Sequence, residues 1–140
     1  MRRHGGRILA DQLRLRGVPR VFSVPGESFL AALDALLDAG IPNVVCRHEG
    51  GAAMMAEATG KLTGAPGVCF VTRGPGATNA SAGVHVARQD GTPMVLFVGD
   101  IERGHRDREA FQEVDFRAMF APLAKWAAEI GSTERIPEYV

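Results

Sequence analysis

The sequence predicts an α/β fold of three layers, αβα, with a mostly parallel central sheet. The candidate strands are short continuous apolar runs rather than alternating ones, which is typical of parallel strands buried on both faces of a sheet. The segments between these runs carry helical patterns, so helices and strands alternate along the chain. Because parallel crossovers are right-handed, we expect helices on both faces of the sheet.

Each element follows from a local pattern. Apolar residues recur at roughly helical spacing in residues 8–15 and again in residues 29–37, where Gly40 favours a C-terminal stop. Residues 50–62 are rich in Ala and Met, and residues 77–88 run up to Asp90-Gly91, which predicts two further helices. The expected strands are VFSV (21–24), VVC (44–46), VCFVT (68–72) and MVLFV (94–98).

The last third of the chain carries different signals. Residues 99–116 are rich in charge and predict a surface loop. The segment AKWAAEI, residues 124–130, favours a further strand, and Ser132 is placed to cap a helix that has only started when the sequence ends. The length fits a single domain over residues 1–140.

Composition argues against several classes of function. The 140 residues include 16 basic and 16 acidic residues, and 6% are aromatic. The chain therefore lacks the charge and stacking surface that nucleic acid requires, and the basic excess that an anionic membrane attracts. No apolar stretch reaches the ~18–20 residues of a membrane span and no signal peptide is evident, so we expect a cytoplasmic protein. Cys46 and Cys69 lie in apolar runs without metal-ligand spacing, which favours buried thiols over a disulfide.

Unusual chemistry lies where the predicted strands end. In open α/β sheets, ligands bind at the carboxyl ends of the strands. Four such ends carry glycine beside charged or polar residues: Pro25-Gly26-Glu27, His48-Glu49-Gly50-Gly51, the segment from Thr72 to Asn79, and Gly99-Asp100. We therefore expect a ligand site at this edge of the sheet.

Glu49 is the least expected of these residues, because a solvated loop would suit a carboxylate better than the end of an apolar strand. An acid in the first turn of a helix gains ~0.3–1 kcal/mol from the macrodipole, which could explain Glu49 alone. The two glycines that follow each weaken a helix start by up to ~1 kcal/mol relative to alanine. They also let another group approach the backbone closely, which favours a ligand beside Glu49. The neighbouring His48 is a weaker candidate.

The segment from Thr72 to Asn79 allows a different function. It nearly matches the G-x-G-x-x-G fingerprint of dinucleotide binding, and Asp100 lies at the end of the next strand, where a ribose acceptor is wanted. However, Asn79 replaces the third glycine, and Pro75 stiffens the turn. An NAD-type dinucleotide-binding domain of a dehydrogenase is therefore an alternative.

Taken together, these strand ends and their flanks resemble the N-terminal, pyrimidine-binding domain of thiamine-diphosphate-dependent enzymes of the acetolactate synthase type. The matching segments follow the family's order and spacing over nearly the whole chain: VFSVPG (21–26), RHEGGAAMMAEATGK (47–61), GVCFVTRGPGATNASAG (67–83), TPMVLFVGD (92–100), AFQEVDF (110–116) and PLAKW (122–126).

The resemblance implies the thiamine-diphosphate-binding fold and a role for Glu49. In the family, the glutamate after this strand hydrogen-bonds N1′ of the aminopyrimidine ring and favours the imino tautomer, whose nitrogen takes the proton from C2 of the thiazolium. The cofactor then acts as the electron sink for decarboxylation of a 2-oxo acid. By position, the resemblance implies cofactor contacts for Val24, Pro25, Thr72, Pro75, Asn79 and Gln112, and a place near the substrate for Phe111 and Gln112.

The resemblance also implies that another domain completes the site. Family members hold the diphosphate and Mg²⁺ in a C-terminal domain marked by Gly-Asp-Gly and a later Asn, a signature that this sequence lacks, so we expect no metal ligands here. The implied partner is the diphosphate-binding domain of a homologous or separately encoded subunit, in a homo- or hetero-oligomer. The implied function is the pyrimidine-binding half of a decarboxylase or carboligase, a lyase or transferase.

Several points stay open. Acetolactate synthases usually carry a second glycine and small residues where Glu27-Ser28-Phe29 stand, so the substrate could be another small 2-oxo acid or an acyl thioester. Some relatives bind FAD in a middle domain, which leaves a flavin in the full-length enzyme open. A non-catalytic vestigial or regulatory module, assembling with a full-length homologue, is a further alternative.

Overall fold

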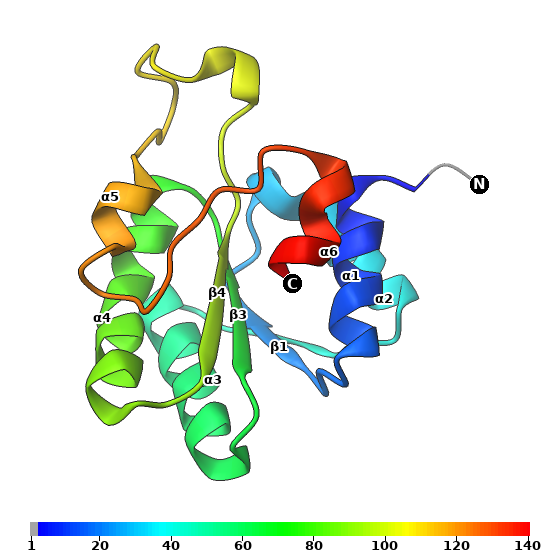
Figure 1. Cartoon of the computed structure of the whole chain (residues 1–140), viewed down its shortest axis with the longest axis vertical. Coiled ribbons are helices and arrows are strands. Elements are labelled where there is room, and N and C mark those ends of the chain that lie inside the picture. Colours follow the sequence, from blue (N-terminus) through cyan, green and yellow to red (C-terminus); the bar gives the residue numbers. More distant parts are fainter. Residues whose placement is uncertain (1–2) are drawn as a thin grey trace.

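The computed structural model describes residues 3–140 and contains a parallel sheet of four strands (Figure 1). Phe22 of the first strand is in register with Val44 of the second and with Cys69 of the third. The predicted parallel sheet is therefore confirmed. The strands lie in the order β2-β1-β3-β4 and are β1 (Val21–Ser23), β2 (Asn43–Val45), β3 (Gly67–Val71) and β4 (Met94–Val98).

Helices cover both faces of this sheet. In Figure 1, α1, α2 and α6 lie on one side of it, and α3, α4 and α5 lie on the other, which confirms the three-layer αβα arrangement. The α-helices are α1 (Gly5–Leu15), α2 (Leu30–Asp38), α3 (Glu49–Thr63), α4 (Gly74–Asp90), α5 (Phe116–Phe120) and α6 (Ile136–Tyr139). The short 3₁₀ helices are η1 (Glu27–Phe29), η2 (Arg103–His105) and η3 (Thr133–Arg135).

The central strand β3 separates two hydrophobic cores. All its residues are buried, and alternate side chains point to opposite faces of the sheet. Val68 and Phe70 join the core formed with α1 and α2, whereas Cys69 and Val71 join the core formed with α3 and α4. Burial raises the pKa of the Cys69 thiol to about 12. Cys69 is thus the buried thiol that the sequence predicts.

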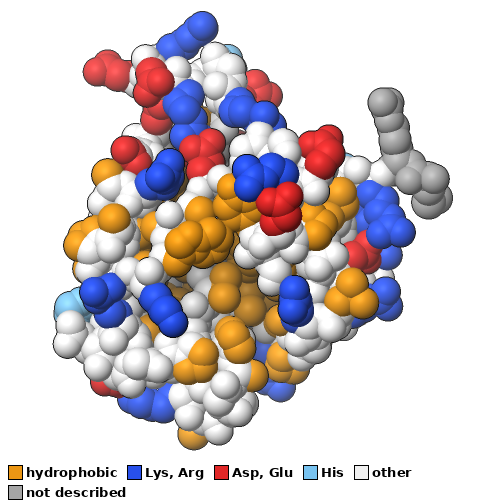
Figure 2. Space-filling view, viewed as in Figure 1, with side chains coloured by type: hydrophobic (Ala, Val, Ile, Leu, Met, Phe, Trp, Pro, Cys, Tyr) orange, Lys and Arg blue, Asp and Glu red, His pale blue; other side chains and the backbone are white. Residues whose placement is uncertain are grey.

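The outer strands are less buried than their apolar sequences predict. β2 and β4 each pair with a single neighbour, so their side chains are half-buried or exposed. Cys46, which directly follows β2, is for this reason only half-buried. In Figure 2, hydrophobic side chains line a hollow in the middle of the face on which Figure 1 shows β4.

Helices α3 and α4 pack closely because glycine lies where they meet. A Cβ added at Gly83 of α4 would lie 2.5 Å from the Cβ of Ala53 in α3. A Cβ added at Gly60, near the end of α3, would lie 2.1 Å from the carbonyl oxygen of Pro93. Because these glycines have no side chains, α3 lies directly against α4 and against Pro93, which precedes β4.

The predicted strand over residues 124–130 is wrong, because this segment is irregular. Its backbone and its tryptophan ring interact with side chains from other parts of the chain rather than with a neighbouring strand. The carbonyl oxygen of Ala124 accepts a hydrogen bond from Arg88 at 2.8 Å, and the rings of Trp126 and Tyr139 stack with their centroids 5.7 Å apart. Apolar composition thus persists here without the backbone partner that a strand needs.

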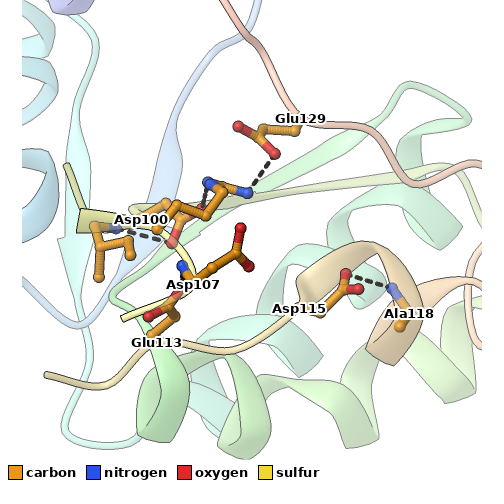
Figure 3. A network of polar contacts seen from close by, with 8 residues as sticks. Asp100, Asp107, Glu113, Asp115, Ala118 and Glu129 are labelled. Atoms are coloured by element: carbon orange, nitrogen blue, oxygen red, sulfur yellow. Dashed lines mark hydrogen bonds and ion pairs between the residues drawn. The ribbon is translucent and has the colours of Figure 1, made fainter. Parts of the chain in front are cut away.

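Two helix starts depart from the sequence analysis. α4 begins at Gly74, before the predicted Ala77, and has Pro75 in its first turn, where proline is favoured. α5 was not predicted, although Asp115 caps it by accepting a hydrogen bond from the Ala118 amide at 2.9 Å (Figure 3). Ser132 precedes η3 and α6 as expected, without a capping hydrogen bond from its hydroxyl.

Candidate functional site

The carboxyl ends of the strands lie at the edge of the sheet from which the loop of residues 99–115 extends (Figure 1). β1 and β3 are neighbours, but the chain leaves β1 toward α2 on one face and β3 toward α4 on the other. Such a divergence is a topological switch point, where open α/β sheets form ligand crevices. Every predicted site residue lies on a segment that follows one of the four strands.

Glu49 is the first residue of α3 and contacts α4. The preceding His48 caps α3, because its Nδ1 accepts a hydrogen bond from the Gly50 amide at 3.0 Å. Glu49 is half-buried, and its Oε2 accepts a hydrogen bond from Nδ2 of Asn79 at 2.9 Å. Two predicted site residues from different helices are therefore in direct contact, and His48 has a structural role beside them.

The second carboxylate oxygen of Glu49 lies beside the backbone of Gly76, which carries no side chain. A Cβ added at Gly76 would lie 3.5 Å from Oε1 of Glu49 and 3.0 Å from Cγ2 of Thr72. Among residues 3–140, Oε1 accepts no hydrogen bond, and the Cβ position of Gly51 has no neighbour within 4 Å. A half-buried carboxyl with one oxygen that accepts no hydrogen bond from the described residues can accept one from a ligand, or share a proton with it.

Thr72 joins the loops that leave β1 and β3. Its Oγ1 shares a hydrogen bond with Oγ of Ser28 at 2.9 Å. A Cβ added at Gly26 would lie 2.5 Å from the Cβ of Thr72, so only glycine lets the two loops approach this closely. One side-chain hydrogen bond and one glycine contact thus hold the two loops together at this edge of the sheet.

Three further candidate residues, from the segments after β1 and β3, lie on the rim of the site. Val24 is half-buried and Pro25 is exposed, directly after β1. Pro75 is exposed on the first turn of α4. These three residues share the strand-end edge with Glu49, but no hydrogen bond of the described chain joins them to it.

The loop of residues 99–115 is held to the body by an arginine. Arg106 donates from Nη2 to Asp100 at 2.8 Å and from Nη1 to Glu129 at 2.6 Å (Figure 3). Asp100 also accepts a hydrogen bond from the Ile101 amide at 2.8 Å. The carboxylate that a dinucleotide-binding domain would offer to a ribose is therefore engaged within the protein.

Glu113 stabilises the same loop through hydrogen bonds within it. Its carboxylate accepts hydrogen bonds from the amides of Asp107 at 2.7 Å and Ala110 at 2.9 Å. The backbone hydrogen bonds from Ala110 and then Asp107 lower the pKa of Glu113, because they stabilise its charged form. Asp107 and Glu109 have positive φ values of 62° and 52°, so the hydrogen bonds hold a tightly turned backbone.

The returning part of the loop, at residues 111–112, lies against the turn between β3 and α4. The Gly74 amide donates a hydrogen bond to the Gln112 carbonyl at 3.0 Å. The exposed ring of Phe111 has its centroid 5.9 Å from Cζ of Arg73. The structure therefore brings Phe111 and Gln112 to the residues that follow Thr72, although neither contacts Glu49 through a hydrogen bond within residues 3–140.

Three residues of this edge were missed as site residues. Ser28 bonds Thr72, and Glu27 forms an ion pair with Arg73 across the same two loops. One signal was present in the sequence, because acidic Glu27 and basic Arg73 each stand shortly after a predicted strand. Opposite charges in loops at the same edge of a sheet favour such a pair.

Other kinds of site receive no support from the described chain. Residues 3–140 contain no group of three or more His, Cys, Asp or Glu side chains that could hold a metal ion. Over the same range, every helix is too short or too polar to cross a membrane.

Comparison with known proteins agrees with this geometry. The model of the family "Thiamine pyrophosphate enzyme, N-terminal TPP binding domain" matches residues 3–119. Acetolactate synthase of Bacillus subtilis is 41% identical over 140 residues, which are 100% of this chain and 25% of that protein. The catabolic acetolactate synthase of Raoultella terrigena is 38% identical over 137 residues, 98% of this chain and 24% of that protein.

The match extends to the acetolactate synthase isozyme 2 large subunit of Escherichia coli, 38% identical over 134 residues, 96% of this chain and 24% of that subunit. The chain thus spans about a quarter of the length of these relatives. The dinucleotide-binding alternative is not favoured. Because the family model covers most of its length, the chain belongs to the thiamine pyrophosphate enzymes and corresponds to their N-terminal TPP-binding domain.

Proposed function

We propose that this chain is the pyrimidine-binding half of a thiamine-diphosphate-dependent 2-oxo-acid decarboxylase or carboligase, in which Glu49 activates the cofactor. Family membership and whole-chain similarity to acetolactate synthases support the cofactor and the enzyme class. The observation that carries the proposal is the carboxyl group of Glu49, held by Asn79 through one oxygen and without a hydrogen bond at the other within residues 3–140.

Glu49 acts as the proton partner of the aminopyrimidine nitrogen N1′. Asn79 fixes the orientation of its carboxyl group, and the half-buried position limits competition from water. Because Gly76 carries no side chain, none stands beside Oε1 at this position. When bound, thiamine diphosphate supplies the carbanion chemistry that side chains cannot.

The other predicted residues surround this proton site. Thr72 and Glu49 both border the Cβ position of Gly76. The rim residues Val24, Pro25 and Pro75 line the pyrimidine site. Phe111 and Gln112, where the loop returns to the body beside Arg73 and Gly74, face the side from which the cofactor and a 2-oxo acid or acyl thioester approach.

The site needs a second domain. Nothing among the described residues offers a metal-binding cluster for the Mg²⁺ that accompanies a diphosphate. We therefore propose a partner domain, in a homologous or separately encoded subunit, that holds the diphosphate and Mg²⁺. The extent of the domain over residues 1–140, a flavin elsewhere in the enzyme and a cytoplasmic location stay predictions.

The proposal is tested by titrating the assembled enzyme calorimetrically with thiamine diphosphate and Mg²⁺, and separately with NAD. We expect binding of the first and none of the second. Gly76→Val should weaken thiamine diphosphate binding about tenfold or more, the equivalent of ~1.4 kcal/mol, because its side chain fills the space beside Glu49. The matched control is Gly104→Val in the loop, where an added Cβ meets nothing within 4 Å.

Binding of NAD, or equal affinity of both variants for thiamine diphosphate, would contradict the assignment of this site. Tight cofactor binding without turnover of any 2-oxo acid or acyl thioester would instead favour the non-catalytic regulatory module.

A further inference from the structure

Arg73 lies between two loops of the site and contacts a residue of each. It forms an ion pair with Glu27, which follows β1, and its guanidinium lies 5.9 Å from the centroid of the Phe111 ring in the loop after β4. Arg73 itself directly precedes α4. Segments that follow three different strands therefore meet at this one side chain.

The two charges of the pair differ in their exposure to water. The Arg73 side chain retains 13% of its exposure, whereas that of Glu27 retains 72%. The Nε of Arg73 is buried and has no hydrogen-bond partner among the described residues. A guanidinium this poorly hydrated is stabilised by its carboxylate partner and by the aromatic face above it, two interactions that suit its planar shape.

The backbone beside Arg73 also contacts Gln112, where the loop after β4 returns to the body. The Gly74 amide donates to the Gln112 carbonyl at 3.0 Å, and a Cβ added at Gly74 would lie 3.0 Å from that oxygen. Gln112 adopts a positive φ of 64°, which few non-glycine residues do. The conformation of residues 111–112 therefore depends on their contacts with Arg73 and Gly74.

We propose that Arg73 is a positioning residue: held by Glu27, it fixes Phe111 and Gln112 over the cofactor site. The inference rests on the proposed function, which places Phe111 and Gln112 next to cofactor and substrate. It adds a residue whose role is to orient the loop rather than to touch the reacting atoms. Lysine could keep the charge opposite Glu27, but it lacks the planar group that stacks on Phe111.

The test is a double-mutant cycle with Arg73→Lys, Phe111→Leu and both changes together in the assembled enzyme. The first measurement is the Kd for thiamine diphosphate with Mg²⁺. Each single change should raise the Kd about tenfold, the size of one partly desolvated cation–π contact. The double variant should be no weaker than the weaker single variant, because both changes remove the same interaction.

The second measurement is amide hydrogen exchange of residues 110–113. Arg73→Lys should accelerate it, while the exposed Arg117→Lys in α5 serves as the matched control and should not. Additive losses of affinity, or unchanged exchange in residues 110–113, would overturn the inference. A merely structural role for Arg73 would change the exchange but leave the two affinity losses additive.

These outcomes are distinct from failure of the proposed function. That failure would appear as a wild-type assembly that does not bind thiamine diphosphate, and the exchange measurement would still show whether Arg73 holds the conformation of residues 110–113.

Discussion

The close contact between α3 and α4 makes a sharp prediction at Gly83. Gly83 lies one turn after Asn79, and Ala53, which it touches, lies one turn after Glu49. Gly83→Ala places a Cβ 2.5 Å from the Cβ of Ala53 and 2.8 Å from its carbonyl carbon, whereas ordinary contact begins near 3.4 Å. The helices must therefore separate by about 1 Å to relieve the overlap.

The magnitude follows from two opposing effects. Alanine is favoured over glycine inside a helix by ~0.8–1 kcal/mol. Overpacking a well-packed core costs ~1–3 kcal/mol, and the upper part of this range applies because the new methyl group meets backbone atoms. We expect Gly83→Ala to lower the free energy of unfolding by about 1–2 kcal/mol.

The matched control is Gly51→Ala in α3, where an added Cβ meets nothing within 4 Å. Here only the helix preference remains, so the free energy of unfolding should rise by about 0.5–1 kcal/mol. Urea unfolding followed by far-ultraviolet circular dichroism compares the two variants through their midpoints at unchanged slope. A Gly83→Ala protein as stable as wild type would refute the claim that this glycine sets the helix spacing.

Three further results are expected. Asn43→Ala should lower the free energy of unfolding by about 1–3 kcal/mol, because it removes the Asn43 oxygen that accepts a hydrogen bond from the fully buried Ser23 hydroxyl at 2.9 Å. Adding Ser23→Ala should recover most of this loss, as measured by urea unfolding. Between pH 9.0 and about 12 the unfolded chain releases the Cys69 proton more readily than the folded chain, so stability should fall as pH rises, and less so in Cys69→Ala. The pKa of Glu113 is lowered below 4.5, so the hydrogen bonds that its carboxylate accepts in the loop should persist above that pH and be lost as pH falls through the lowered value. Faster amide exchange in residues 107–110 should report this loss. Glu113→Gln should show the faster exchange already at neutral pH.

Most of the fold could be predicted from the sequence because the central strands carry unambiguous signals. β1 and β3 are buried on both faces, so their sequences are continuous apolar runs. The segment 124–130 is also largely apolar, although Lys125 and Glu129 interrupt it, but a strand also requires a neighbouring edge, which composition does not reveal. Likewise, Leu15 and Leu37 fit a helical apolar pattern yet are exposed, because spacing alone does not say how wide a face is covered.

The site was predictable in its parts rather than in its contacts. The sequence located Glu49 and Asn79 at strand-to-helix junctions, but their hydrogen bond depends on how closely α3 and α4 pack. The pairing of Arg73 with Glu27 and Phe111 joins residues far apart in the chain. Such side-chain contacts between loops depend on the tertiary structure, so no local pattern predicts them.

The role of Glu49 is tested most directly by exchange of the thiazolium C2 proton with solvent deuterium, measured on thiamine diphosphate bound to the assembled enzyme. Glu49→Gln keeps the size of the side chain but cannot exchange a proton with N1′. We expect C2 exchange to slow by about 10²- to 10⁴-fold, the usual contribution of a positioned acid or base. The exposed Glu102→Gln is the matched control and should exchange like wild type. Exchange as fast in Glu49→Gln as in wild type, with the cofactor bound, would contradict the account.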